Sequence, residues 1–416
     1  MKKEQYHHHQ QDDDHQQQLI QSASKLQLSQ GYLQNLVIYF LFFGSGLVIG
    51  ITLSSYLKDN HQSFQLRQFS SINIPPPIPD EDEYIPEIQQ PEPPLPHQQP
   101  IAPDGRLGLT DYLKPPYCKH DMTEDELLWR ASMKPKVIYE YPFKRVPKVA
   151  FMFLAKQDLP LAPLWEMFFR GHEGLYSIYI HSLPSYNGTV PEDSVFHNRN
   201  IPSKDVEWGK FSMVEAERRL MANALLDFSN QRFVLLSEAC IPLFNFSTIY
   251  DYLIKSTTSF VESYDLIGPV GRGRYDHHML PYVTLKEWRK GSQWFEMNRE
   301  LALEFISDRL YFSIFRKYCK PACYSDEHYL PTFITKKFAN KNANRTLTWV
   351  DWSRGGPHPT KFIRTDITLE MLNRLRSGTE CVYNGRPTNI CYLFARKFTS
   401  NALDRLLRFA PRVMQL

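Results

Sequence analysis

The hydrophobic pattern divides the chain into four regions. A polar stretch at 1–34 is followed by an uncharged apolar run at 35–57 and then by a proline-rich stretch at 58–117. Only the last region, 118–416, mixes apolar and polar residues as folded domains do, and it is long enough to bury a substantial core. The pattern therefore predicts one large folded domain preceded by three segments of other kinds.

Within the last region, short apolar runs alternate with longer amphipathic segments. The runs predict strands at 149–154, 175–181, 232–237 and 264–267, and the segments predict helices at 163–172, 211–230 and 249–255. Ser212 and Glu215 have the spacing of a capping box at the start of the longest helix. Strands that alternate with helices predict an α/β fold with a mostly parallel central sheet. Ligands in such folds bind beyond the carboxyl ends of the strands, here near His181 and Ser237.

The apolar run at 35–57 fits a transmembrane helix, which needs about 20 residues to cross the hydrocarbon core. A buried core helix would show a polar face, which this run lacks. A cleaved signal peptide would begin closer to Met1 and end at a small-residue cleavage site. We therefore predict a signal-anchor helix that contacts the lipid bilayer.

The charges that flank the run barely fix its orientation, but the cysteines and glycosylation sequons do. All six cysteines follow the run. Three N-x-S/T sequons also follow it, at Asn187, Asn245 and Asn344. Both features indicate an oxidising lumen, so we predict a single-pass type II membrane protein with a cytosolic tail. The disulfide pairing stays open; the local choices are Cys319 with Cys323 and Cys381 with Cys391.

Composition defines the regions on both sides of the anchor. The tail at 1–34 is rich in Gln, His and Asp, which predicts a disordered, solvated segment rather than a metal site. The stretch at 58–117 has a proline density that favours an extended spacer, and a lumenal stem is preferred over a PxxP ligand. The net charge of +3 gives no reason to expect nucleic acid as a partner.

Three clusters in the last region could carry chemistry. In YSDEHYLPT, Asp326, Glu327 and His328 offer acid and base groups, although Ser325 and Asp326 could instead cap a helix. In TWVDWSRGGPHPTKFIR, two tryptophans either stack on sugar rings or pack in the core. In LFARKF, two adjacent cations are either a solvated pair or contacts to a ligand diphosphate.

The sequence gives no sign of a metal site in the last region. His277 and His278 are adjacent, lack the spacing of metal ligands and have no evident third partner. The stretch after the strand at 232–237 reads SEACIP, where an Asp-x-Asp would be expected in a metal-dependent enzyme that uses a nucleotide sugar. We therefore expect no metal and no other cofactor.

These motifs together resemble the core-2/I-branching β-1,6-N-acetylglucosaminyltransferase family (glycosyltransferase family 14), most closely its plant brittle-culm-like branch. The resemblance runs from Lys148 to the C-terminus. It is carried by WGKFSMVEAERRLMANAL, FVLLSEACIPL, KGSQWFEMNRE and the three clusters above. It implies a GT-A type fold and an inverting, metal-independent glycosyltransferase of the Golgi membrane.

The resemblance also implies roles for single residues. Glu327 matches the general base, and Arg364 and Lys397 match the cations that hold the donor diphosphate. Trp352 and, with a weaker match, Arg274 correspond to residues on the acceptor side. His181 stands where relatives carry an aspartate that binds the donor nucleoside, so this departure leaves the donor open.

The expected reaction transfers a sugar from a UDP-sugar to a glycan or glycoprotein, with N-acetylglucosamine as the default. One alternative keeps the fold and uses another donor, such as UDP-glucuronic acid on arabinogalactan-type glycans. The other is a non-catalytic Golgi protein that binds glycans.

Overall fold

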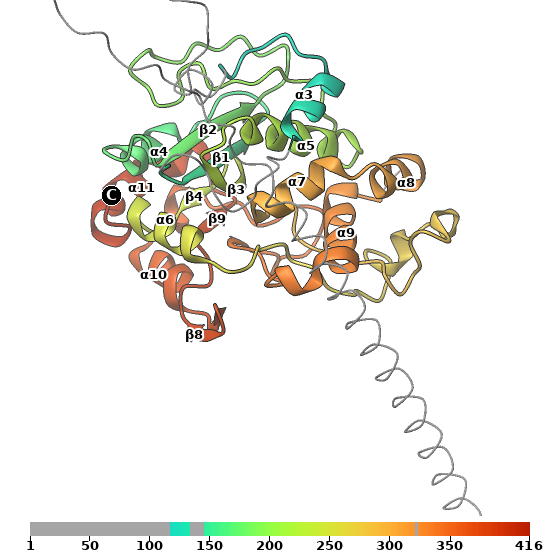
Figure 1. Ribbon diagram of the computed structural model, residues 1–416. Helices are drawn as coiled ribbons and strands as arrows, with labels where there is room; N and C mark the ends of the chain where they lie inside the picture. The colour runs from blue at the N-terminus through green and yellow to red at the C-terminus, as the bar shows by residue number, and fades with distance from the viewer. Residues whose placement is uncertain (1–116, 134–144, 321–322) are drawn as a thin grey trace, which may run out of the picture. The chain divides into compact units, whose positions relative to one another are not determined.

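The computed structural model describes residues 117–133, 145–320 and 323–416 (Figure 1). The predicted tail, the predicted anchor at 35–57 and the predicted stem up to residue 116 lie outside these ranges. Among the described residues, no helix combines the length and the hydrophobicity that a bilayer-spanning segment requires.

The described part of the chain is built on a four-stranded sheet in the order β2-β1-β3-β5. Its strands are β1 (Lys148–Leu154), β2 (Tyr176–His181), β3 (Asn230–Ser237) and β5 (Glu296–Asn298). β1 pairs in parallel with both β2 and β3, and β5 pairs antiparallel with β3 at the edge. The prediction of an α/β fold with a mostly parallel sheet is therefore confirmed.

A smaller sheet in the order β4-β9-β6 lies at the end of β3. Its strands are β4 (Ile241–Pro242), β6 (Thr348–Val350) and β9 (Phe394–Arg396), and a separate hairpin contains β7 (Cys381–Tyr383) and β8 (Arg386–Thr388). Disulfides join Cys381 to Cys391 beside this hairpin and Cys319 to Cys323 elsewhere. These are the two local pairings that the sequence left open.

Helices cover both faces of the main sheet (Figure 1). They are α3 (Glu124–Ala131), α4 (Ala162–Phe169), α5 (Ser212–Leu225), α6 (Phe246–Lys255), α7 (Arg299–Ser307), α8 (Leu310–Tyr318), α9 (Tyr329–Phe338), α10 (Leu369–Ser377) and α11 (Leu403–Val413). Short 3-10 helices are η1 (Arg272–Arg274), η2 (His277–Met279), η3 (Ser325–Glu327), η4 (Ala339–Lys341), η5 (Arg364–Asp366) and η6 (Ser400–Ala402).

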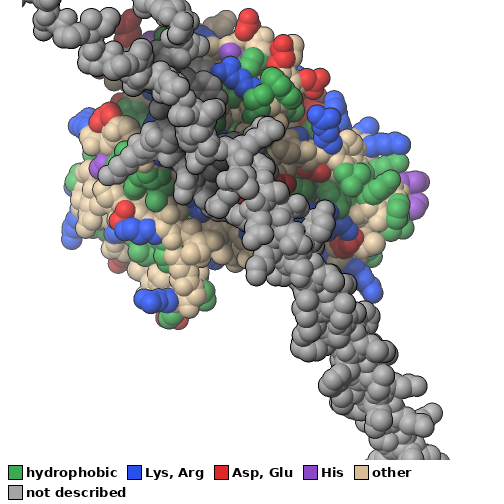
Figure 2. Space-filling view, in the orientation of Figure 1, with side chains coloured by type: hydrophobic (Ala, Val, Ile, Leu, Met, Phe, Trp, Pro, Cys, Tyr) green, Lys and Arg blue, Asp and Glu red, His purple; other side chains and the backbone are tan. Residues whose placement is uncertain are grey.

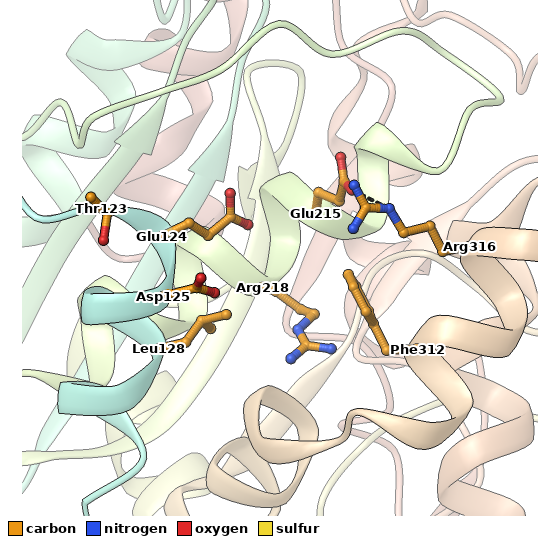
Figure 3. Close-up of a pocket in the computed structure, with 8 residues that line it drawn as sticks. All are labelled: Thr123, Glu124, Asp125, Leu128, Glu215, Arg218, Phe312 and Arg316. Atoms are coloured by element: carbon orange, nitrogen blue, oxygen red, sulfur yellow. Dashed lines mark ion pairs between the residues drawn. The ribbon is translucent and has the colours of Figure 1, made fainter.

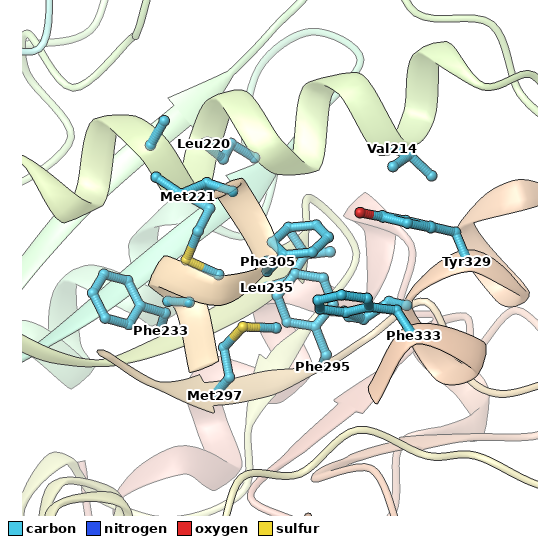
Figure 4. Packing of buried hydrophobic residues seen from close by; sticks show 14 of the residues in the cluster. Val214, Leu220, Met221, Phe233, Leu235, Phe295, Met297, Phe305, Tyr329 and Phe333 are labelled. Atoms are coloured by element: carbon cyan, nitrogen blue, oxygen red, sulfur yellow. The ribbon is translucent and has the colours of Figure 1, made fainter. Parts of the chain in front are cut away.

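The strands are continuous apolar runs because both faces of the sheet are buried. Alternate residues of β1 belong to two different hydrophobic clusters. Met152 packs in the cluster that includes Met221 of α5 and Leu235 of β3 (Figure 4). Phe151 packs on the opposite face with Trp165 of α4 and with residues of α6 and α11. The sheet is thereby fixed between two helical layers.

The longest predicted helix is shorter than its periodicity indicated, and its predicted capping box is wrong. α5 begins at Ser212 and ends at Leu225 rather than at residue 230, and its N-cap is Phe211, with no side-chain hydrogen bond. The Ser212 hydroxyl instead accepts a hydrogen bond from the Glu207 backbone N–H at 3.0 Å. Because Ser212 is already inside the helix, its hydroxyl faces the preceding turn.

The predicted strand at 264–267 is also wrong. Only Tyr264 forms a β-bridge there, with Lys290. The chain turns directly afterwards, since Gly268 has a φ of +117° and its carbonyl accepts from the Gly271 N–H at 3.2 Å. A run of four apolar and polar residues followed by Gly-Pro is therefore too short to extend a sheet.

Phe151 tests how far stability depends on the aromatic side of the sheet. Its ring is fully buried, with ring centroids of Phe169 and Phe168 at 5.0 and 5.8 Å. We expect Phe151→Ala to lower the free energy of unfolding by about 3–5 kcal/mol, because it leaves a cavity. Denaturant unfolding of the purified protein measures this. The control Trp129→Ala, at a position 66% exposed, should change it by less than about 0.5 kcal/mol; an equal effect of both variants would contradict the prediction.

Candidate active site

The carboxyl ends of the parallel strands meet at one edge of the main sheet. Leu154 at the end of β1 pairs with His181 of β2 and with Ser237 of β3. The Phe398 N–H donates to the Ala239 carbonyl at 3.0 Å, which brings the end of β9 beside the end of β3. This edge is where α/β folds bind their ligands, and it collects several of the predicted residues.

Glu327 is the last residue of η3, and two cations hold its carboxylate. Its Oε2 accepts from Arg274 Nη1 at 2.9 Å and from Lys290 Nζ. The side chain is 22% exposed, so it is partly accessible to solvent. Both cations contact the same oxygen, and Oε1 receives no hydrogen bond from the described part of the chain. The carboxylate is thus oriented through one oxygen while the other can accept a proton.

A backbone contact places Lys290 beside Glu327. The N–H of Gly291 donates to the Glu327 carbonyl at 2.8 Å. A side chain at residue 291 would put Cβ only 1.8 Å from the carbonyl oxygen of Glu262, so this close approach requires glycine. Because the backbone of Gly291 lies against those of Glu262 and Glu327, the neighbouring Lys290 side chain is held within reach of the Glu327 carboxylate.

Two buried carboxyl groups lie behind Glu327. Burial, and next the charge of Glu327, raise the pKa of Asp326 to about 7. Burial, and next the charge of Asp326, raise the pKa of Glu217 well above its usual range, and Gln293 donates to Glu217 Oε1 at 2.9 Å. Oδ1 of Asp326 is buried without a hydrogen-bond partner among the described residues. Near neutral pH, therefore, Glu327 borders carboxyl groups that favour the neutral form.

The alternative role of Ser325 and Asp326 as caps of α9 is not seen. The N-cap of α9 is His328, with no side-chain hydrogen bond. The His328 ring stacks on Trp288 at a centroid distance of 4.5 Å, and its Nδ1 contacts the Arg289 carbonyl at 2.7 Å. Burial lowers the pKa of His328 to about 3, so the ring is neutral and serves packing.

Lys397 forms the second charged part of the site, at the end of β9. Burial lowers its pKa, the positive charges of Arg396 and Lys361 lower it further, and Glu238 acts in the opposite direction. The Arg396 guanidinium lies over the ring of Trp294, with Cζ 4.1 Å from the centroid. Three cations near one carboxylate leave an excess of positive charge at the end of β3, which suits a bound anion.

Arg364 lies on the same edge but does not contact Lys397 directly. It is exposed at the start of η5. Two residues earlier, the Phe362 N–H donates to the Lys397 carbonyl at 2.8 Å, and the Phe362 carbonyl accepts from the Thr399 N–H at 3.1 Å. The two backbones are thus paired, and Arg364 extends from this pairing into solvent.

His181 is buried at the end of β2 and does not face solvent. Its Nε2 lies 3.3 Å from Nη1 of Arg219 and 3.4 Å from the backbone N of Lys204. Burial, followed by the charge of Arg219, lowers its pKa to about 4, so Nε2 can accept hydrogen bonds. Arg219 also pairs with Glu124 at 3.0 Å. In the fold, His181 contacts Arg219 and the backbone of Lys204, and its role on the donor side stays a prediction.

The segment 290–294 connects the two charged parts. Its first residue pairs with Glu327 and its last, Trp294, lies under Arg396. Sequence reasoning noted KGSQWFEMNRE only as a motif and did not predict that Lys290 contacts the base, because nothing in the sequence relates residue 290 to residue 327. The one available signal in the sequence was the Lys290-Gly291 pair shortly before a buried strand, since a glycine there permits a close approach of two backbones.

The remaining predicted residues are spread over the surface. Trp352 is half exposed after β6. Of the sequon residues, Asn187 and Asn344 are exposed, whereas Asn245 is half-buried and caps α6 by accepting from the Thr248 N–H at 2.9 Å. None of these positions tests the predicted roles, which stay predictions.

A hollow of about 320 Å³ lies between α3, α5 and α8 (Figure 3), away from the predicted residues. Its charged groups are satisfied locally. Arg316 pairs with Glu215 at 3.4 Å, and Arg218 lies 3.9 Å from the Phe312 ring centroid while it donates to the Ile306 and Asp308 carbonyls. Asp125, which also lines the hollow, is an exposed carboxylate in the first turn of α3.

Residues 264–285, which supply Arg274, carry exposed hydrophobic side chains next to histidines (Figure 2). Asp276, His277 and His278 have side-chain ligand atoms within 4.8 Å of one another. Asp276 is thus a third group beside the two histidines, where the sequence showed no evident third partner. Asp276 Oδ1 is occupied by the His278 N–H at 2.9 Å, and both histidines are exposed. This group is a surface feature, and it does not touch Glu327.

The α/β sheet carries an oriented carboxylate and an excess of positive charge at its carboxyl edge, an arrangement that suits an enzyme whose leaving group is an anion. A family model described as Core-2/I-Branching enzyme matches residues 149–376. The chain is also 36% identical over 306 residues to "Glycosyltransferase BC10" of Oryza sativa subsp. japonica, which covers 62% of this chain and 76% of that relative. The chain belongs to the core-2/I-branching enzyme family and is a glycosyltransferase, as its motifs predicted. Its mixed α/β architecture fits a GT-A-like transferase.

The pKa of Asp326 predicts a pH-dependent effect on stability. In the unfolded chain Asp326 ionises near pH 4, whereas in the fold it stays protonated up to about pH 7. The folded state thus binds this proton more tightly than the unfolded state. The free energy of unfolding therefore falls as the pH rises from about 4 to about 7. We expect Asp326→Asn, which cannot ionise, to gain about 1–3 kcal/mol in unfolding free energy relative to the wild type between pH 5 and pH 7.5.

Denaturant unfolding of both proteins across this range measures the difference. The control Asp125→Asn changes an exposed carboxylate in the first turn of α3 and should show no such trend. A difference between Asp326→Asn and the wild type that is the same at pH 5 and pH 7.5 would contradict the assigned pKa.

Proposed function

We propose that this glycosyltransferase moves a sugar from a UDP-sugar to a hydroxyl of a glycan or glycoprotein, with inversion and without a metal. N-acetylglucosamine is the default donor sugar. The observation that carries the proposal is the pair of charged groups at one sheet edge. Glu327 has one oxygen to which none of the described residues donates, and Lys397 lies in excess positive charge. A base and a site for the leaving group are the two parts that a single displacement requires.

In the proposed step, Oε1 of Glu327 takes the proton of the acceptor hydroxyl. The hydroxyl oxygen forms a bond to the anomeric carbon of the donor sugar, and the bond from that carbon to the diphosphate oxygen breaks. The negative charge that leaves with UDP is stabilised by Lys397 and by Arg364, which can close on it from the exposed η5 turn. Trp352 and Arg274 lie on the side of the acceptor.

The donor sugar is the open part of the proposal. His181 is buried against Arg219 where relatives carry an aspartate, so UDP-glucuronic acid on arabinogalactan-type glycans is the alternative donor and acceptor pair. A screen of UDP-sugars for hydrolysis and for thermal stabilisation of the purified protein separates the two. The proposal that UDP-sugars are donors fails if none of them is hydrolysed or bound.

We further propose that the enzyme is a type II protein of the Golgi membrane, anchored through residues 35–57. The disulfides Cys319–Cys323 and Cys381–Cys391 support a lumenal position, because such bonds persist in oxidising compartments. The exposed sequons Asn187 and Asn344 agree with the same side of the membrane. A glycosidase shift of the protein from microsomes tests this position.

Glu327→Gln tests the base directly. The amide keeps the size of the side chain but cannot accept the proton, so we expect transfer to fall by about 10²–10⁴-fold. UDP affinity should stay within about twofold of the wild type. The control Glu300→Gln alters an exposed carboxylate on α7 and should keep full activity. Full activity of Glu327→Gln would remove this residue from the mechanism.

Removal of metal and of Lys397 tests how the diphosphate is held. We expect UDP to bind equally well with and without EDTA, because protein cations provide the charge. Lys397→Ala should weaken UDP binding by about 10- to 100-fold, the effect of losing a hydrogen bond to a charged group. Lys255→Ala, at an exposed position of α6, serves as the control. Calorimetric titration measures all four affinities, and a strict requirement for Mn²⁺ would refute the proposal.

A further inference from the structure

Trp208 is a large aromatic residue near Glu327 that the proposed mechanism does not use. It lies in the loop before α5 and is 56% exposed, although tryptophan is highly buried on average. Its ring still contacts two others, with centroid distances of 5.1 Å to Tyr324 and 5.0 Å to His358. The indole is therefore partly open to solvent and partly packed against the rings of Tyr324 and His358.

The backbone around Trp208 keeps this indole in place. Gly209 has a φ of +76°, and a Cβ there would lie 3.2 Å from Cε1 of Tyr324. Tyr324 has a φ of +53°, which is uncommon for a residue other than glycine. Two unusual backbone conformations thus press the loop and the Tyr324 ring together. The indole is positioned before any ligand arrives, which lowers the entropy lost on binding.

Tyr324 also connects Trp208 to the base. Cζ of Arg274 lies 4.2 Å from the centroid of the Tyr324 ring, and Arg274 Nη1 lies 2.9 Å from Glu327 Oε2. Three successive contacts therefore run from the indole to the carboxylate. On the other side of the site, Arg396, the neighbour of Lys397 in the chain, lies over a different aromatic ring, Trp294. The indole thus lies on the acceptor side of Glu327.

We infer that Trp208 binds a pyranose ring of the acceptor glycan by stacking and so selects which acceptors are used. The inference rests on the proposed function, in which Glu327 takes the proton of the acceptor hydroxyl. One face of a pyranose carries several C–H groups with partial positive charge, and they complement the negative face of an indole. A protein surface or a nucleotide base would be an alternative partner, but the connection through Tyr324 to Arg274 and Glu327 favours the acceptor sugar.

Direct binding tests this without turnover. The purified full-length protein is applied to an array of plant and animal oligosaccharides as wild type, Trp208→Ala, Trp208→Tyr and the control Trp129→Ala. We expect the wild type to bind a set of glycans, and Trp208→Ala to bind them about 3- to 10-fold more weakly, the effect of one aromatic contact. Trp208→Tyr should retain most of the binding, and Trp129→Ala, 66% exposed on α3, all of it.

Kinetics with a bound glycan as acceptor should show a raised KM for the acceptor in Trp208→Ala, with kcat and the KM for the UDP-sugar unchanged. Equal glycan binding by wild type and Trp208→Ala, or no glycan bound by the wild type, overturns the inference. A loss of UDP affinity instead would mean that the indole stacks on the donor base, and would overturn it as well. If the wild type binds glycans through Trp208 but transfers no sugar, only the proposed function fails. Melting temperatures of the variants confirm that each is folded.

Discussion

The close approach of Gly291 to the backbone of Glu262 is the constraint on which the site depends. It lets the segment 290–294 run between two parts of the fold and end with Lys290 at Glu327 and Trp294 under Arg396. One short stretch of backbone therefore sets the positions of both charged groups relative to each other. A side chain at residue 291 would displace this stretch, and the separation of base and anion site would change with it.

The two charged groups differ in how their charges are balanced. The Glu327 carboxylate has two cations on one oxygen, so it is held firmly, while the buried carboxyl groups of Asp326 and Glu217 behind it favour the neutral form. At the other group, the positive charges of Lys397, Arg396 and Lys361 are opposed by the carboxylate of Glu238. The charge of Glu327 is thus compensated without a ligand. The excess positive charge around Lys397 is compensated only when an anion binds.

The sequence predicted those features that depend on local pattern. The apolar runs that became β1, β2 and β3 are buried on both faces, so their composition alone marked them. The cluster of acid and base groups drew attention to 326–328, but the choice of Glu327 as the base came from the family resemblance and stays a prediction. The contact of Lys290 with Glu327 and that of Trp208 with Tyr324 were missed, since each joins residues distant in the chain. Ser212 had the right spacing for a cap, but its actual position inside the helix gave its hydroxyl another partner.

The excess positive charge around Lys397 also bears on how the catalytic cycle ends. Under the proposed mechanism, the same cations that stabilise the departing diphosphate remain next to it after the sugar has left. Burial of Lys397 strengthens its attraction for the diphosphate, since little water screens it there. Under that mechanism we expect release of the nucleotide product, rather than the chemical step, to limit turnover. In cells, the rate of the enzyme would follow the removal of free UDP from its surroundings as much as the supply of donor.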